Sequence, residues 1–195
     1  MVTASAAGKA ILFGEHAVVY GEPALAVAID ARVSVSLVPC KGEWKIDGYP
    51  LDTTRHPHIG YLKNTILGEE SQSYSIQVNS ELFPAAGLGS SAALSSACSA
   101  AMLSTIGQPL DPEKIATLSH LAEAAAQSGR ASPTDTSTAT LGGCVFVSDK
   151  KESSSISNFL KKIQLNTIFT NFKLIKFINA GPIRSLRIYK SLENR

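Results

Sequence analysis

Apolar and polar positions alternate along two segments of this chain. Within residues 24–38, apolar side chains occupy every second position from Val33 to Leu37, and residues 74–78 repeat the pattern. Such alternation is typical of a strand with one buried face. The apolar segment 9–20 indicates a further strand, and a Gly-Glu-Pro turn separates it from the next one.

Helices are expected between these strands. A short helix is predicted over residues 57–69, because a proline lies at its start. Residues 90–106 are rich in Ala, Leu and Met, which favour helix, and their small side chains suit close packing against a sheet. Asp111 before Pro112 is the pattern of a helix N-cap, and this helix should end near Gln127.

The remaining segments are polar or contain glycine. Residues 40–58 are turn-rich, and residues 130–138 form a Ser/Thr/Pro/Asp stretch that we interpret as a loop. Residues 139–148 are expected to return to a strand that Gly142 and Gly143 interrupt. The sequence therefore predicts an α+β chain.

Composition changes after residue 149 and suggests a domain boundary there. Residues 1–149 carry a formal net charge of −6 and residues 150–195 carry +8, which gives +2 for the whole chain. The first part is rich in Ala, Ser and Gly, whereas residues 150–158 resemble a Lys/Ser linker before a segment of Phe, Ile, Lys and Asn. We predict two units, 1–149 and 150–195.

Charge and composition argue against nucleic-acid binding, a membrane span, a disulfide framework and a zinc site. The basic residues near the C-terminus alternate with apolar ones and form no compact block, so nucleic-acid binding is not expected. No apolar run reaches the ~20 residues of a membrane span, and the N-terminus has no signal pattern, so a cytoplasmic protein is expected. The three cysteines are far apart and match neither a disulfide framework nor a zinc motif.

A glycine-rich turn before the predicted helix 90–106 is the strongest chemical signal. Free N–H groups and the positive end of a helix dipole would meet there, which favours a phosphate. Gly87 and Gly89 permit positive φ, and Ser90 and Ser91 could cap the helix or reach a phosphate and its metal. The predicted phosphate-binding residues are Pro84, Ala85, Ala86, Gly87, Leu88, Gly89, Ser90, Ser91 and Ala92.

This turn has three other interpretations. It lacks the lysine of a P-loop. It does fit Gly-x-Gly-x-x-Ala of a dinucleotide fold, but Asp111, at the required spacing, starts a helix and does not end a strand. A tight turn without a ligand is also compatible with the pattern.

Two more clusters carry candidate chemistry. Lys9, Glu15 and His16 interrupt an apolar segment, and a buried lysine needs an anionic partner. Asp135 lies in the Ser/Thr-rich stretch after Pro133. Taken singly, the first cluster is better explained by solvated strand ends and a core histidine, and the second by an Asx turn.

Together, these segments resemble the GHMP kinases, and among them the mevalonate kinase branch of archaeal type. The resemblance lies in Ala-Gly-Lys at 7–9, Gly-Glu-His-Ala-Val-Val-Tyr-Gly at 14–21, the glycine turn 84–93, and Ser-Pro-Thr-Asp-Thr at 132–136. It implies a GHMP-kinase N-terminal domain (ribosomal protein S5 domain 2-like) followed by an incomplete ferredoxin-like C-terminal domain.

The resemblance also implies an activity and the roles of particular residues. The reaction would transfer the γ-phosphoryl group of ATP to the 5-hydroxyl of mevalonate. Asp135 would take the alcohol proton and Lys9 would stabilise the alkoxide, while His16 and Glu15 would contact mevalonate. Mg²⁺ would be held by two further side chains, Ser91 and Glu123.

The chain departs from the family pattern at three points. Glu123 lies one position further from Gly129 than usual, and Ala124 occupies the expected place. Ala7 replaces a usual proline. The C-terminal domain is incomplete relative to the family, which suggests a truncated or frameshifted reading frame of low activity; a homodimer is one option for the full-length enzyme. A different GHMP kinase and a non-catalytic remnant are the alternatives.

Overall fold

The computed structural model describes most of the first 147 residues and two short strands beyond them. The described residues are 1–16, 24–69, 71–83, 85–129, 131–147, 154–155 and 187–190. The predicted strand end at 17–20, Pro84 and most of the predicted second unit, 150–195, lie outside the described residues. The family motif at 14–21 is therefore described only through His16.

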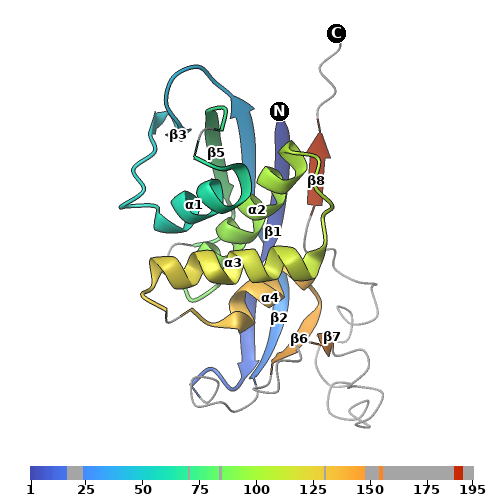
Figure 1. Ribbon diagram of the computed structural model, residues 1–195. Helices are drawn as coiled ribbons and strands as arrows, with labels where there is room; N and C mark the ends of the chain where they lie inside the picture. Colours follow the sequence, from blue (N-terminus) through green and yellow to red (C-terminus); the bar gives the residue numbers. More distant parts are fainter. Residues whose placement is uncertain are drawn as a thin grey trace.

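One mixed sheet forms the frame of the molecule (Figure 1). Its main path runs β4-β3-β5-β2-β1-β8, and β6 pairs with β2 and with β7. All the pairings are antiparallel except that of β3 with β5. The strands are β1 (Val2–Phe13), β2 (Ala24–Pro39), β3 (Lys45–Ile46), β4 (Tyr49–Pro50), β5 (Tyr74–Ser80), β6 (Cys144–Val147), β7 (Ser154–Ser155) and β8 (Arg187–Lys190).

The helices gather on one side of this sheet in two layers (Figure 1). Two of them, α2 and α4, pack directly on β1 and β2, and α3 packs on α1, α2 and α4. The helical segments are α1 (Pro57–Leu62), the π-helical turn η2 (Lys63–Leu67), α2 (Ser90–Thr105), α3 (Pro112–Ala126) and α4 (Pro133–Leu141).

Small side chains let α2 lie close to the sheet. Most residues of this helix are buried, and alanine, serine and cysteine predominate among them. On the facing strand β1, Ala4 and Ala6 are fully buried. Larger apolar groups, among them Val35, Leu37 and Ile76, complete the core. From Ala92 onward, α2 is thereby held closely against the sheet.

Several predicted elements are confirmed with small shifts in their ends. The helices at 57–69, 90–106 and from Asp111 to Gln127 are present, and so is the strand at 74–78. Strand β1 already begins at Val2 and ends at Phe13, earlier than predicted. The turn-rich segment 40–58 includes the short strands β3 and β4.

The predicted loop 130–138 is wrong, because α4 occupies most of it. Ser132 caps this helix by accepting a hydrogen bond from Thr134 N, and Pro133 stands in its first turn. Its threonines are buried against the sheet and neighbouring helices, and this packing outweighs their low helix propensity. The following strand therefore begins at Cys144 and not at residue 139.

Candidate active site

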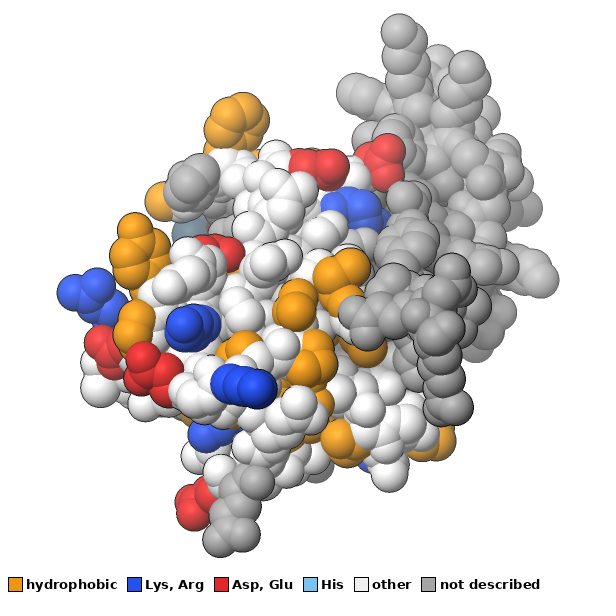
Figure 2. Space-filling view, turned by 90° about the horizontal axis from the view of Figure 1, so that it is seen from above, with side chains coloured by type: hydrophobic (Ala, Val, Ile, Leu, Met, Phe, Trp, Pro, Cys, Tyr) orange, Lys and Arg blue, Asp and Glu red, His pale blue; other side chains and the backbone are white. Residues whose placement is uncertain are grey.

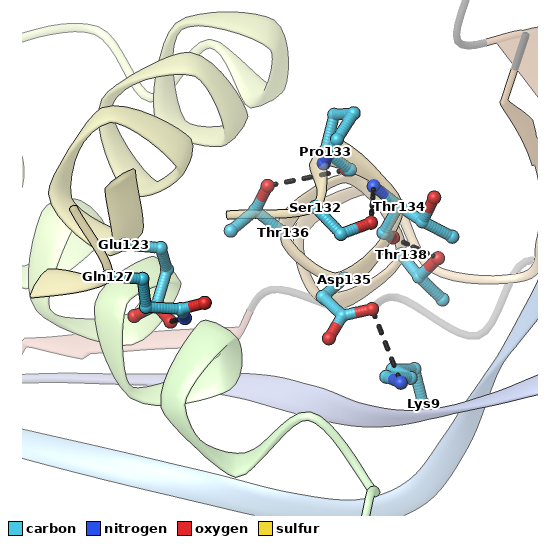
Figure 3. Close-up of polar contacts among 9 residues, drawn as sticks. All are labelled: Lys9, Glu123, Gln127, Ser132, Pro133, Thr134, Asp135, Thr136 and Thr138. Atoms are coloured by element: carbon cyan, nitrogen blue, oxygen red, sulfur yellow. Dashed lines mark hydrogen bonds and ion pairs between the residues drawn. The ribbon is translucent and has the colours of Figure 1, made fainter. Parts of the chain in front are cut away.

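A buried ammonium and a carboxylate meet between β1 and α4. Lys9 Nζ lies 3.2 Å from Asp135 Oδ1, and the two side chains are 6% and 30% exposed. Figure 3 shows Asp135 pointing from the first turn of α4 toward Lys9 on the strand. The carboxylate supplies the anionic partner that a buried lysine requires.

Local backbone geometry places the Lys9 side chain. The register between β1 and β2 shifts between Ala7 and Lys9, on either side of Gly8. A Cβ at Gly8 would lie 2.6 Å from a Leu82 methyl carbon, so a larger residue here would require Leu82 to move. Such irregularities redirect side chains near functional sites. Lys9 N also donates a 2.9 Å hydrogen bond to Leu88 O, which ties the strand to the glycine turn.

The surroundings of Asp135 raise the affinity of its carboxylate for a proton. Burial raises the pKa of this carboxyl above its ordinary value, and the nearby charges of Glu123 and Glu15 act in the same direction. The Lys9 charge and hydrogen bond lower the pKa but do not outweigh burial. A carboxylate with a raised pKa is a better proton acceptor for an alcohol than an ordinary aspartate.

The glycine turn lies directly beside this pair. Gly87 and Gly89 have φ values of 70° and 71°, as the sequence predicted, and Ala85 also has a positive φ, 55°. A Cβ at Gly89 would lie 2.8 Å from Lys9 Cγ, so the turn touches the lysine stem at its glycine. Ala85, Ala86 and Gly87 are exposed and accessible to a ligand.

The serines that follow the turn do not cap the helix. Gly89 is the N-cap of α2, and among the described residues no side chain caps the free N–H groups at this end. These donors, together with the helix dipole, are the features that bind phosphate at helix starts. The expectation that Ser90 or Ser91 caps the helix is thus wrong, because the hydroxyl of Ser91 has another partner.

That partner is Glu123 on α3. Ser91 Oγ donates to both oxygens of this carboxylate, at 2.8 and 2.7 Å. Glu123 is 3% exposed, whereas Ser91 is exposed at the start of α2. Glu123 therefore faces the glycine turn despite its displaced position relative to Gly129.

The two residues expected at the alcohol substrate lie at the end of β1. Glu15 and His16 form an exposed turn after Phe13. Glu15 is close enough for its charge to raise the pKa of Asp135. The structure thus brings Lys9, Asp135, Ser91 and Glu123 around the turn, with Glu15 within electrostatic range.

Three further polar residues of the site were missed in the sequence. Ser95 and Gln127 both hydrogen-bond the Glu123 carboxylate. Helical spacing could have indicated both, because Ser95 lies four residues after Ser91 and Gln127 lies four residues after Glu123. His58 on α1 is buried, and burial lowers the pKa of its imidazole while the charge of Glu123 opposes that effect. No pattern in the sequence connects α1 with this site.

Comparison with known proteins now identifies the class. Residues 58–143 match the family described as GHMP kinases N terminal domain. Among known proteins the chain is similar to mevalonate kinases. It is 37% identical to the enzyme of Methanothermobacter thermautotrophicus over 157 residues, which are 76% of this chain and 51% of the relative. It is 37% identical to the Archaeoglobus fulgidus enzyme over 159 residues, 76% of this chain and 54% of that one.

A solved structure shares the fold. The Methanococcus jannaschii mevalonate kinase superposes with a TM-score of 0.67 and 26% identity, covering 83% of this chain and 58% of that one. The expected GHMP N-terminal fold is confirmed. The chain spans about half the length of the curated relatives it matches.

Two further observations concern membrane-spanning helices and surface charge. No helix among the described residues is both long and apolar enough to span a membrane. On the face shown in Figure 2, acidic and basic side chains are interspersed around the apolar ones.

Proposed function

We propose that this chain carries the ATP- and mevalonate-binding part of a mevalonate kinase, which phosphorylates the 5-hydroxyl of mevalonate. The observation that carries the proposal is the 3.2 Å contact between Lys9 and Asp135 beside a glycine turn that opens a helix. Phosphoryl transfer depends mainly on positioning and charge stabilisation, and this site offers both. The mevalonate kinases among the relatives support the choice of substrate.

Each group has a step in this proposal. The free N–H groups at the start of α2 hold the phosphates. Asp135 accepts the hydroxyl proton as the oxygen attacks phosphorus, and its raised pKa favours that transfer. The Lys9 ammonium stabilises the negative charge that develops on the oxygen. Glu15 and His16 are proposed to contact mevalonate.

Ser91 and Glu123 fit a magnesium site. Both offer oxygen, and Mg²⁺ is usually bound by one or two carboxylates together with substrate phosphates and water. Glu123 is buried without an ion pair to lysine or arginine among the described residues, so its charge calls for a cation. The described residues contain no group of three His, Cys, Asp or Glu that could bind a metal, consistent with a site completed by phosphate oxygens. Bound Mg²⁺ would neutralise charge on the phosphates.

Calorimetric titration of the 195-residue protein with Mg-ATP tests these roles. We expect Ser91→Ala to abolish or strongly weaken binding and Asp135→Ala to leave it nearly unchanged. The reverse pattern would overturn the assignments. Titration with mevalonate, phosphomevalonate and galactose should show binding of mevalonate alone, and preference for either of the others would refute the substrate.

Catalytic turnover by this chain is proposed separately from ligand binding. We propose low or no phosphorylation by these 195 residues alone, because the segment matched in the Methanothermobacter thermautotrophicus enzyme is only 51% of that enzyme. A rate in the ordinary range of kinases, ~1–100 s⁻¹, would contradict this. A homodimer of the full-length enzyme and a cytoplasmic location stay predictions.

A further inference from the structure

The Glu123 carboxylate is held by more donors than a metal ligand alone needs. Besides the two contacts from Ser91, Ser95 Oγ donates to Oε1 at 2.5 Å and Gln127 Nε2 donates to Oε2 at 3.0 Å. Figure 3 shows Gln127 beside Glu123 on the same helix. Each carboxylate oxygen therefore has its own donor in addition to Ser91.

We propose that Ser95 and Gln127 are positioning residues that keep the Glu123 carboxylate aimed at the metal of the bound nucleotide. The inference rests on the proposed function, because it concerns the magnesium site of the same reaction. Partners of this kind fix the orientation of metal-binding carboxylates, and their loss typically lowers metal affinity about 10–100-fold.

The placement of the three donors supports separate roles. Ser91 is exposed at the turn, where its hydroxyl is accessible to phosphate and metal. Ser95 lies one helical turn further along α2 and is fully buried, away from any ligand. Gln127 approaches from the C-terminal end of α3. A metal ion can thus replace the Ser91 contact while Ser95 and Gln127 continue to hold both oxygens.

The next turn of the same two helices provides a matched control. There Ser99 on α2 meets Ser119 on α3, with the hydroxyl oxygens 3.2 Å apart. Both serines are fully buried, as Ser95 is, but no carboxylate takes part in this contact. A purely structural role for hydroxyls between α2 and α3 would make Ser95 and Ser99 equivalent in metal binding.

The test measures how strongly magnesium enhances nucleotide binding. The dissociation constant of AMP-PNP is determined for the 195-residue protein in excess Mg²⁺ and in EDTA, and the ratio of the two is the enhancement. We expect Ser95→Ala to reduce this ratio about 10-fold, with little change in the EDTA value. Gln127→Ala should reduce it in the same direction; because Gln127 is exposed, this variant should fold normally.

The controls separate the inference from the proposed function. Ser99→Ala and the exposed Gln108→Ala should keep the wild-type ratio, and Ser91→Ala should lose it. If Ser91→Ala loses the enhancement while Ser95→Ala and Gln127→Ala match Ser99→Ala, the inference is wrong and the function stands. If the wild-type protein itself shows no enhancement by Mg²⁺, the proposed function fails and the inference with it.

Discussion

At the scale of single residues, Lys9 and Asp135 face different environments although they form one ion pair. The lysine side chain is 6% exposed and the aspartate is 30% exposed. An aspartate that loses its partner can therefore still contact water, whereas a lysine that loses its partner is left as a buried charge. Removal of one partner from a buried pair is costly for this reason.

This asymmetry predicts unequal effects on stability. Asp135→Ala should lower the free energy of unfolding by about 2 kcal/mol, because it removes both oxygens and leaves the buried Lys9 ammonium without this partner; the loss is somewhat less than for a fully buried pair, since the carboxylate is partly exposed. Lys9→Met keeps most of the stem and should cost about 1 kcal/mol. Urea unfolding at neutral pH measures both. Equal losses, or a larger loss in Lys9→Met, would argue against an ammonium that depends on this carboxylate.

The titration of Asp135 gives a second prediction. Because burial raises the pKa of Asp135, its carboxyl carbon should titrate by NMR with a midpoint above 3.8. Protonated Asp135 contributes to the free energy of unfolding. This contribution is fully present below pH 3.8 and is lost as the pH rises through the folded-state pKa. Lys9→Met should raise the midpoint further, because the lysine charge lowers it. An unchanged or lower midpoint in Lys9→Met would show that the pair does not form in solution.

At the scale of elements, the glycine turn and β1 form one unit. Leu88 O accepts the Lys9 N–H, and Gly89 lies against the lysine stem with φ in the left-handed region. The turn thus links the start of α2 to the strand that carries the lysine. Gly87 shares the left-handed φ but would place a Cβ in open space.

The two glycines make a matched pair of variants. Gly87→Ala should cost about 1 kcal/mol from backbone strain alone. Gly89→Ala should cost more, because its Cβ would also displace Lys9 Cγ, 2.8 Å away. It should in addition shift the Asp135 titration, which Gly87→Ala should leave in place. Urea unfolding and the NMR titration provide the measurements, and equal behaviour of the two variants would contradict the contact.

Two helices with similar starts show which helices the sequence alone predicts. Asp111-Pro112 and Ser132-Pro133 both start helices, yet only the first was predicted. The residues after Pro112 favour helix, whereas half of those after Pro133 in α4 are threonine and gain their stability from burial. Local propensity identifies the first helix, and tertiary packing decides the second.

The candidate site, like the helices, was predictable from the sequence only in part. Lys9, the glycine turn and Asp135 lie in recognisable motifs. Ser95 and Gln127 do not, because their role depends on how α2 packs against α3. The resemblance to a family supplied the grouping of the motifs, and the structure supplied the contacts within it.

At the scale of the whole molecule, α2 is enclosed by the other elements. It contacts β1 and β2 on the sheet, and α1, α3 and α4 on its other sides. By contrast, no residue of the π-helical turn η2 is buried. Regions with few buried contacts open locally, while enclosed helices open only when the domain unfolds.

Amide hydrogen exchange should reveal this difference. Amides in the middle of α2, around Ala97 and Ala100, should exchange with a free energy of opening close to that of global unfolding, since these residues are fully buried. Amides in η2 should exchange much faster. Mass spectrometry of peptides after pulse labelling measures both. Equal protection of the two segments would contradict a core centred on α2.

The contact between Gly89 and the stem of Lys9 also constrains how this site can evolve. A larger residue at position 89 and a long cation at position 9 compete for the same space. A lineage that enlarges position 89 has to move or shorten the side chain at position 9, and so disturbs the proposed stabilisation of the alkoxide. The two positions should therefore covary across homologous sequences, although 80 positions of chain separate them.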